Sequence, residues 1–419
     1  MRCDRLVQPG IYISISVGRS IFPRQAGQPS NPASRKIRLF LRHCGNLIAD
    51  SAAHVSFNGL KNMNILALVP SICGNSPGQR SSIELWDRIL RPAGINLIFA
   101  PFETERLRGI LYARGRYVSK SIEVVRAYLE RLRLTRNLSS FDAVFVYREA
   151  ALLGPAILER RIAQSGKPLI YQLDDPLYVP YRSPTNGYLS YLKCFSKVAD
   201  ICRLSKVVIV NSRQIKEYAL KYNNNVWQIP SVVDSDVYVF QPRASSSTPT
   251  CIGWSGSPTT VGNLRVIADA LRELAGRVDH GVHFIGGTRF DLPGVSYTAQ
   301  NWRAETEVED LRRIEVGVVP LPINEWNKRK FYMKVVQYMS LGIPTVCTPL
   351  GSNPDVVEHG VTGFLANTTS EWVEYLEKLI RDSSLRLSMG QNAARVAREK
   401  YSLAANAGRI IGAFNTAVT

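Results

Sequence analysis

The sequence predicts an α/β protein with two parallel sheets in series, each covered by helices on both faces. Short apolar runs rich in Val and Ile alternate with stretches of helical spacing. The alternation stops at a segment rich in Pro and Ser and then restarts, which indicates two domains. The length of 419 residues also exceeds one ordinary hydrophobic core. With 45% apolar and 21% charged residues, the composition excludes disordered, collagen-like and coiled-coil chains.

Residues 1–62 differ from the rest of the chain. They carry nine Lys or Arg against two acidic residues, lack a periodic apolar pattern and include a turn-rich run at residues 24–34. We interpret them as an extension outside the folded protein, with translation starting at Met63. A targeting peptide is the competing interpretation, but the apolar run at residues 11–17 is short and interrupted by serines. We expect residues 63–419 to fold and act alone.

The N-terminal half is predicted to hold five strands that are apolar at nearly every position, as in a parallel sheet buried on both faces. They lie at residues 63–69, 95–101, 143–147, 169–173 and 207–211. Helical spacing predicts the connecting helices at residues 81–90, 122–134, 151–163, 189–204 and 213–222. Residues 63–240 are therefore assigned to an N-terminal Rossmann-like domain.

Residues 241–249 are predicted to be a linker, after which the same pattern begins again. Strands are expected at residues 250–253, 282–285, 316–320 and 344–347, and helices at 264–275, 308–314, 331–341 and 372–380. Residues 250–400 thus form a second Rossmann-like domain. Ligands of open α/β sheets bind beyond the carboxyl ends of the strands, so two such sheets that face each other imply a cleft for two substrates.

The charge balance predicts anionic partners. The chain has 52 Lys plus Arg and 34 Asp plus Glu, a formal charge of +18, and removal of residues 1–62, which carry +7, leaves +11. Nucleic acid, acidic lipid and phosphorylated small molecules all fit this sign. A basic nucleic-acid-binding protein is an alternative that depends on charge alone, because no nucleic-acid-binding module is present in the sequence.

Cysteine usage and hydropathy indicate the compartment. The seven cysteines are scattered without a CxxC pair or a close Cys/His cluster, so neither a zinc module nor a disulfide framework is predicted, and a reducing cytoplasm fits best. No window approaches 18 uninterrupted apolar residues, so any membrane contact is expected to be peripheral. Between Arg106 and Arg136, nine Lys or Arg occur against two Glu among many apolar residues. This mixture suggests binding to an anionic membrane surface; the alternative is a solvated helix packed on the sheet.

Two places in the N-terminal half carry candidate binding residues. The first strand leads through a loop with Gly78 and Arg80 into a helix, where backbone amides and a guanidinium suit an anionic or carboxylate group. Asp174 and Asp175 end another strand. An unpaired acidic pair there can orient hydroxyl groups of a substrate, whereas helix capping and a turn at Asp-Pro are the structural alternative. No third ligand nearby favours a metal.

The C-terminal half carries a stronger constellation. Gly256 and Ser257 leave room for a phosphate at a helix start, although tight packing explains small residues equally well. A strand then feeds a loop with Asn324 and Glu325, followed by three cations at residues 328–330. We expect a helix on which Lys330, Lys334 and Gln337 share one face. The three cations near its N-terminus are expected to form a pocket for a dianionic group. A solvated basic face is the alternative.

These residues carry a family resemblance. The stretch KFYMKVVQYMSLGIPTV from Lys330 to Val346, followed by PLGSNPDVVEHGVTGFL from Pro349 to Leu365, resembles the C-terminal domain of group 1 glycosyltransferases, the retaining GT-B enzymes. The resemblance implies a nucleotide-sugar donor held mainly by residues 250–400 and an acceptor held by the N-terminal domain. It also implies a final helix within residues 401–419 that crosses back to the N-terminal domain.

The resemblance assigns roles to the candidate residues. The phosphate-binding, catalytic positions are Lys330 and Lys334; the donor-binding positions are Gly256, Ser257, Asn324, Glu325 and Gln337; the acceptor-side positions are Gly78, Arg80, Asp174 and Asp175. Two departures stand out. Many relatives carry glutamates where this chain has Arg329 and Gln337, and the usual Arg and Lys of the first C-terminal loop are replaced by Ser255, Gly256 and Ser257.

The expected reaction is sugar transfer to a glycan or lipid-linked acceptor, in the cytoplasm and in cell-envelope polysaccharide synthesis. Fixed cations stabilise the charge that builds on the departing diphosphate. The resemblance implies that the leaving phosphate takes the proton of the acceptor, so no protein nucleophile is expected. It also implies no essential metal, and no other cofactor is expected. A nucleotide-sugar epimerase or hydrolase of the same fold is the alternative.

Overall fold

The computed structural model describes residues 62–419 except 112, 114, 181–191, 243–248 and 258–259. The interpretation of residues 1–62 as an extension therefore lies almost wholly outside the described residues. All described residues belong to one compact unit, residues 59–419.

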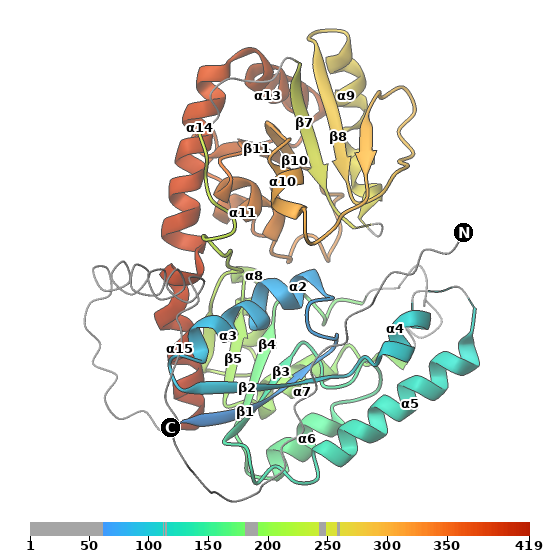
Figure 1. The fold of residues 1–419 in the computed structure, drawn as a ribbon, viewed down its shortest axis with the longest axis vertical. Helices are drawn as coiled ribbons and strands as arrows, with labels where there is room; N and C mark the ends of the chain where they lie inside the picture. The colour runs from blue at the N-terminus through green and yellow to red at the C-terminus, as the bar shows by residue number, and fades with distance from the viewer. Residues whose placement is uncertain (1–61, 112, 114, 181–191, 243–248, 258–259) are drawn as a thin grey trace, which may run out of the picture. The chain divides into compact units, whose positions relative to one another are not determined.

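The first sheet has six parallel strands in the order β2-β1-β3-β4-β5-β6 (Figure 1). They are β1 (Met63–Val69), β2 (Ile95–Pro101), β3 (Ala143–Tyr147), β4 (Leu169–Leu173), β5 (Val207–Val210) and β6 (Val226–Gln228). The five predicted strands are confirmed. The edge strand β6 was missed because it has three residues and none of them is fully buried.

The second sheet also has six parallel strands, in the order β12-β11-β10-β7-β8-β9. They are β7 (Thr250–Ser255), β8 (His280–Ile285), β9 (Thr298–Gln300), β10 (Val316–Val319), β11 (Thr345–Cys347) and β12 (Gly363–Leu365). The four predicted strands are confirmed, and the two edge strands β9 and β12 were missed. The prediction of two parallel sheets in an α/β fold is correct.

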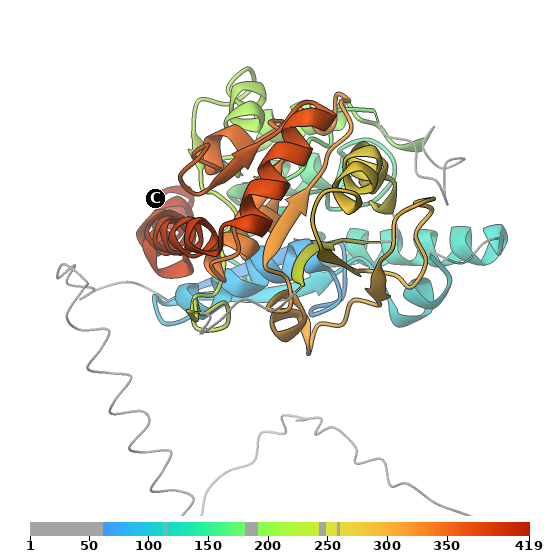
Figure 2. The same ribbon diagram turned by 90° about the horizontal axis from the view of Figure 1, so that it is seen from above.

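Helices connect the strands of the first sheet. They are α2 (Pro77–Gln79), a π-helical turn (Arg80–Glu84), α3 (Leu85–Leu90), α4 (Glu105–Leu111), α5 (Tyr117–Leu134), α6 (Ile157–Gln164), α7 (Lys197–Leu204) and α8 (Arg213–Ala219). With 18 residues α5 is the longest of these. It lies at the outer edge of the first sheet and its helices in both Figure 1 and Figure 2.

The helices of the second sheet follow the same plan. They are a 3-10 helix (Val261–Ile267), α9 (Ala268–Ala275), α10 (Glu307–Leu311), α11 (Met333–Ser340), α12 (Asn353–Val356), α13 (Thr369–Arg381) and α14 (Ser383–Val396). A π-helical turn (Ala397–Tyr401) then leads into α15 (Leu403–Val418). We call the part built on the first sheet the N-terminal domain and the part built on the second sheet the C-terminal domain. In the described chain, no helix is long and apolar enough to cross a membrane.

Several predicted helices begin at the wrong residue; the helix expected at residues 122–134, for example, starts at Tyr117. The helix expected at residues 151–163 starts only at Ile157, because Gly154 takes a left-handed backbone with φ of 81° and Pro155 follows it. The helix expected at residues 189–204 starts at Lys197, and residues 189–191 lie outside the described residues. The helix expected at residues 81–90 starts earlier and is kinked at Ser82, whose backbone angles are not helical.

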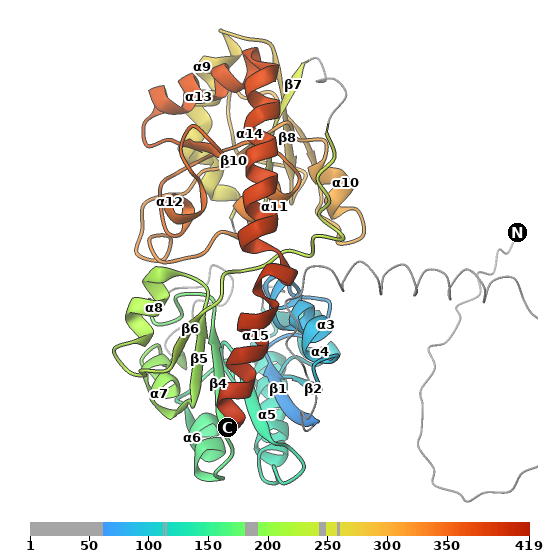
Figure 3. The same cartoon turned by 90° about the vertical axis from the view of Figure 1, so that its left-hand side faces the viewer.

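The C-terminal helix completes the core of the N-terminal domain. Ile410, Ala413 and Phe414 of α15 are buried in one cluster with residues of β1, β3 and β5. The Phe414 ring stacks on Phe145 of β3, with ring centroids 5.5 Å apart. Figure 3 shows α14 leading into α15, which runs beside the first sheet. The predicted return of the final helix to the N-terminal domain is confirmed.

Candidate functional site

Residues that follow the carboxyl ends of strands in the two sheets form ion pairs with each other. The Lys330 Nζ lies 3.0 Å from the Asp175 Oδ1, and the Arg80 Nη2 lies 3.0 Å from the Glu307 Oε2. Three of these four residues were predicted as site residues, and Glu307 was not. The structure therefore brings the acceptor-side candidates Arg80 and Asp175 into contact with the C-terminal domain.

Asp174 and Asp175 are not an unpaired acidic pair, which corrects that interpretation. Tyr147 donates a hydrogen bond of 2.5 Å to the Asp174 Oδ2, and the Arg148 Nε donates one of 2.6 Å to the Oδ1. The Arg148 Nη2 also lies 2.8 Å from the Asp175 Oδ2. Burial favours the neutral acid, yet the cations Arg148 and Lys330 lower the pKa of Asp175 below its ordinary value. The Asp175 carboxylate is thus held as an anion, and both carboxylates have Arg148 as a cationic partner.

Arg148 is the central residue that sequence reasoning missed. It follows β3 directly and has a left-handed backbone with φ of 65°, which is uncommon for a residue other than glycine. A Cβ atom placed on Gly78 would lie 3.0 Å from the Arg148 Nη2 and 3.2 Å from the Tyr147 Oη. Gly78 therefore leaves the space that the arginine occupies. The Tyr-Arg-Glu sequence at the end of a buried strand was a signal that could have identified this residue.

Glu307, at the start of α10, joins a second group of polar side chains. Its Oε1 accepts hydrogen bonds from the Trp302 Nε1 at 3.1 Å and from the Gln337 Nε2 at 3.3 Å. Its Oε2 accepts from Arg80, whose guanidinium lies 5.4 Å from the centre of the Trp302 ring. Gln337 also donates a 2.7 Å hydrogen bond to Tyr238. Gln337, which was predicted to bind the nucleotide-sugar donor, therefore has the Glu307 carboxylate beside it.

Lys330 and Lys334 occupy different environments. Because α11 begins at Met333, Lys330 precedes the helix, and the predicted shared helical face with Lys334 and Gln337 is wrong for Lys330. The Lys330 ammonium is paired with Asp175. The Lys334 ammonium lies 5.4 Å from the centre of the Trp254 ring, and among the described residues it has no hydrogen bond or ion pair.

Burial of Lys334 lowers its pKa to about 8. Glu307 opposes the shift and Lys330 adds to it. An amine with this pKa is mostly protonated at neutral pH, and an anion that approaches it stabilises the charged form. Lys334 is therefore a positive charge without an anionic partner at the start of α11.

In the loop before α11, charged side chains form ion pairs with each other. Glu325 pairs with Lys328 at 2.8 Å and with Arg329 at 2.5 Å, and these hydrogen bonds lower the pKa of Glu325 to about 2. The Asn324 Oδ1 accepts a 2.8 Å hydrogen bond from the backbone of Asn327. Of the three cations predicted to form one pocket, two are thus paired with Glu325, and all three have anionic partners.

Tight packing surrounds the loop after β7. A Cβ atom on Gly256 would overlap the ring of Trp254, and the Gly256 amide donates a 2.8 Å hydrogen bond to the Ile285 carbonyl. The Ser257 amide donates to the Thr260 Oγ1 at 3.1 Å. Packing thus accounts for the glycine. The Trp254 ring leaves no room for a side chain at position 256, and the same ring lies beside the Lys334 ammonium. The predicted site residues Gly256 and Lys334 therefore both pack against Trp254.

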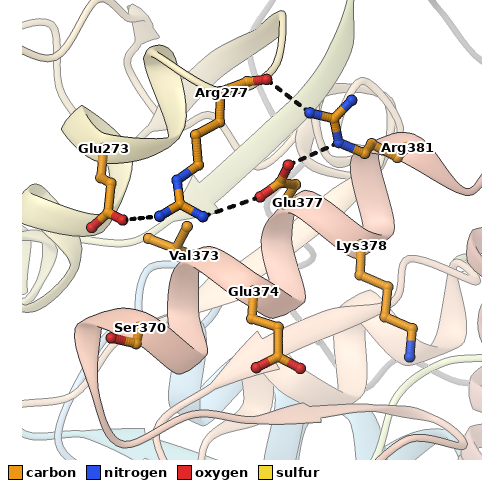
Figure 4. Close-up of a pocket in the computed structure, with 8 residues that line it drawn as sticks. All are labelled: Glu273, Arg277, Ser370, Val373, Glu374, Glu377, Lys378 and Arg381. Atoms are coloured by element: carbon orange, nitrogen blue, oxygen red, sulfur yellow. Dashed lines mark hydrogen bonds and ion pairs between the residues drawn. The ribbon is translucent and has the colours of Figure 1, made fainter.

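Within the described part of the chain, no group of three or more His, Cys, Asp or Glu residues is arranged to hold a metal ion. A hollow lies between α9 and α13 (Figure 4). Arg277, Glu377 and Arg381 pair with one another there, since Arg277 lies 3.5 Å from Glu377 and Glu377 lies 2.8 Å from Arg381. This hollow holds none of the residues described above.

Comparison with known sequences identifies part of the chain. Residues 251–382 match the family described as Glycosyl transferases group 1. N-acetyl-alpha-D-glucosaminyl L-malate synthase from Bacillus anthracis is 29% identical over 76 residues. That match covers 18% of this chain and 20% of the relative, so this chain spans only a fifth of that curated protein.

Solved structures match over most of the chain. HepE from Anabaena in complex with UDP-glucose has a TM-score of 0.57 at 16% identity, and the match covers 84% of this chain and 100% of HepE. Sucrose-phosphate synthase from Thermosynechococcus elongatus has a TM-score of 0.61 at 13% identity, with 84% and 98% covered. At these identities the likeness shows the fold. Residues 251–382 are therefore a group 1 glycosyltransferase domain, within a chain that has the two-domain fold of GT-B glycosyltransferases.

Proposed function

We propose that this protein transfers a sugar from a nucleotide-sugar donor to an acceptor hydroxyl, with retention of the anomeric configuration. The observation that carries the proposal is the partly buried ammonium of Lys334, which has no anionic partner among the described residues and lies in a group 1 glycosyltransferase domain. A diphosphate is the anion that such a domain would place there. HepE was solved with UDP-glucose, so UDP-sugars are the first donors to test.

The chemistry follows from charge. When the bond between the anomeric carbon and the diphosphate breaks, the bonding electrons stay on the leaving phosphate oxygen, and fixed cations stabilise that charge. Lys334 supplies one cation, and Lys330 a second once a diphosphate competes with Asp175 for its ammonium. The first backbone amides of α11 add to the field, because the N-cap residue Tyr332 makes no side-chain capping hydrogen bond.

The acceptor oxygen then bonds to the anomeric carbon on the face that the phosphate leaves, and its proton passes to the leaving phosphate. This assignment needs no protein nucleophile and no metal. Asn324 and Glu325 are the proposed sugar contacts, and Gly256 and Ser257 the proposed phosphate contacts. Asn324 and Glu325 must exchange the partners they hold in the loop for hydroxyl groups of the sugar.

Gln337 and Glu307 are the proposed contacts of the nucleotide ribose. A neutral amide holds hydroxyl groups less strongly than a carboxylate does. Glu307 places a carboxylate 3.3 Å from the Gln337 amide, which supports the view that α10 supplies the charge missing from α11. Gly78, Arg80, Asp174 and Asp175 are the proposed acceptor-side residues, with Arg148 added from the structure.

We further propose that the acceptor is a glycan or a lipid-linked sugar, and that the protein acts in the cytoplasm in the synthesis of cell-envelope polysaccharide. The surface of α5, treated in the next subsection, supports a site of action beside a membrane. The names of the similar proteins point to different acceptors, since one is an N-acetyl-alpha-D-glucosaminyl L-malate synthase and another a sucrose-phosphate synthase. The acceptor is therefore a question for experiment.

The test is a screen of nucleotide sugars followed by variants of the phosphate site. Charge-assisted hydrogen bonds contribute roughly 1.5–3 kcal/mol each, so Lys334→Ala and Lys330→Ala should each slow transfer by about one to two powers of ten. Lys328→Ala is the matched control, because Lys328 is exposed and already paired with Glu325. Full activity in Lys334→Ala would overturn the proposal.

Product analysis separates transfer from other reactions of the same fold. A transferase should form glycosylated product only when an acceptor is added. Release of free sugar at the same rate with and without acceptor would indicate a hydrolase. Conversion of the donor into an epimer would indicate an epimerase, and either result would replace the proposed function.

A further inference from the structure

The helix α5 turns an apolar face to solvent. Val118, Ile122, Val125 and Leu129 are 74%, 47%, 56% and 46% exposed. Their spacing of four, three and four residues places them in one stripe along the helix. Within the described residues nothing covers this stripe, and Figure 2 shows α5 (turquoise) along one side of the structure.

The opposite face of α5 buries cations. Lys120 and Arg131 are each 2% exposed, and Ala127 between them is 4% exposed. Arg131 donates from Nη2 to the Val69 carbonyl at 2.8 Å, whereas its buried Nε and Nη1 have no partner in the described chain. Burial lowers the pKa of Arg131 to about 10, against a smaller opposing effect of Glu159. Burying a guanidinium with two unpaired nitrogens lowers the stability of the folded protein.

An ordinary surface helix buries its apolar face and exposes its charges. The helix α5 does so only in part, because Val124 and Tyr128 pack against the core while the aliphatic stripe is exposed and Arg131 is buried. Turning α5 about its axis would bury Ile122 and Val125 and release Arg131 to water. The fold does not do so. The exposed stripe is therefore not explained by packing among the described residues, and a partner outside them would explain it.

Arginines surround the stripe. Arg126 and Arg133 lie beside it on the helix, each with a glutamate three residues earlier at 2.6 Å and 2.7 Å. Arg116 precedes the helix, Arg136 follows it, and both are exposed. An aliphatic stripe with arginines along its border and at its ends matches the pattern of helices that lie in the interface of a bilayer.

The position of α5 in the topology is also informative. It belongs to the connection from β2 to β3, two parallel strands on either side of β1. A helix that returns the chain between parallel strands begins at their carboxyl ends, so Val118 lies toward the same edge of the sheet as Asp174 at the end of β4. The stripe thus begins on the side of the proposed acceptor residues.

We propose that this face of α5 binds the surface of an anionic lipid bilayer, with the four aliphatic side chains in the interface and the arginines at the headgroup phosphates. Charge decides between this occupant and a second copy of the chain. Two copies, each with a net charge of +18, repel one another, whereas anionic lipid attracts this surface. The proposal concerns binding and does not depend on the reaction assigned above.

The experiment is co-sedimentation of the full chain with vesicles of phosphatidylcholine alone or of phosphatidylcholine mixed with phosphatidylglycerol. Ile122→Ser/Val125→Ser removes two exposed aliphatic groups, and binding to the anionic vesicles should fall at least about tenfold. Arg116→Gln/Arg136→Gln should lower it by about fivefold for each arginine removed. The matched control is Val266→Ser/Leu387→Ser, two exposed aliphatic residues of the C-terminal domain, which should bind as the wild type does.

The results separate the outcomes. Binding that requires anionic lipid, falls in both α5 variants and persists in the control supports the proposal. No binding by the wild type, equal binding to both kinds of vesicle, or full binding by the α5 variants would overturn it. A wild-type dimer in sedimentation velocity that becomes a monomer in Ile122→Ser/Val125→Ser, without vesicle binding, would assign the face to a second copy. Circular dichroism checks that each variant is folded.

Discussion

Replacement of Lys334 by methionine should make the protein more stable and nearly inactive. In the wild type, burial lowers the pKa of Lys334 to about 8, so the charged form that prevails at pH 7 is held at a cost in folding free energy. Methionine keeps the length and most of the apolar stem of lysine beside Trp254 but carries no charge. The same substitution removes the proposed phosphate contact.

The magnitude follows from the pKa. Lowering it from 10.5 to about 8 corresponds to about 3 kcal/mol at pH 7. Water still reaches the partly buried amine, and the contact with the Trp254 ring, worth about 0.5–1 kcal/mol, is lost in the variant. We therefore expect Lys334→Met to raise the free energy of unfolding by about 1–2 kcal/mol at pH 7.

The pH dependence tests the cause of that gain. Between pH 8 and 10.5 the unfolded chain binds more protons at Lys334 than the folded protein does, so the stability of the wild type rises with pH relative to the variant. The advantage of Lys334→Met should be largest below pH 8 and should shrink as the pH approaches 10.5. Urea unfolding followed by tryptophan fluorescence suits the measurement, because Trp254 lies beside the substituted residue.

Two further measurements complete the comparison. Transfer activity in Lys334→Met should fall by about one to two powers of ten. Lys328→Met, at an exposed lysine, should change neither stability nor activity by a comparable amount. The reasoning is refuted if Lys334→Met is less stable than the wild type at pH 7, or if its stability advantage does not change with pH.

Three other predictions concern the proposed site and the residues packed around it. The kcat/KM for the donor should fall as the pH rises through about 8, because the free enzyme then loses the Lys334 charge; a profile that stays flat up to pH 10 would contradict the assignment. Gly256→Ala should destabilise the protein by about 1–3 kcal/mol through overlap with Trp254, whereas Gly262→Ala, where a Cβ meets nothing within 4 Å, should not; equal melting temperatures would contradict the packing. Transfer should persist in excess chelator, and activity that is lost there and restored by Mn²⁺ would instead make Asp174 and Asp175 candidate ligands.

The fold was predictable because buried parallel strands leave a simple mark in the sequence. Runs such as Val207–Val210 are apolar at every position, and each is followed by a stretch of helical spacing. The missed strands β6, β9 and β12 have three residues each, too few for any pattern. Some helix starts were predicted wrongly because they depend on local backbone conformation, such as the left-handed Gly154. The spacing of apolar residues carries no information about that conformation.

The site was less predictable, because its contacts join residues far apart in the chain. Lys330 and Asp175 were both named, but for different substrates, and only the folded chain shows that they pair. Arg148 and Glu307 were missed because an arginine after a strand and a glutamate at a helix start are common on protein surfaces. Sequence spacing also placed Lys330 on a helix that begins three residues later. Residue type was enough to name several site residues, but the sequence did not show which residues contact each other.

The packing of α15 fixes an order of folding. The core of the first sheet includes Ile410 and Phe414, which are translated long after the strands that they cover. On the ribosome, β1 to β6 emerge first, and α3 covers part of one apolar face through Trp86 and Leu90, but the rest of that face stays open until α15 follows. The helices that cover β7 to β12 are translated before α15. The domain that is synthesised first is therefore the last to complete its core. Until then its exposed apolar surface can bind chaperones.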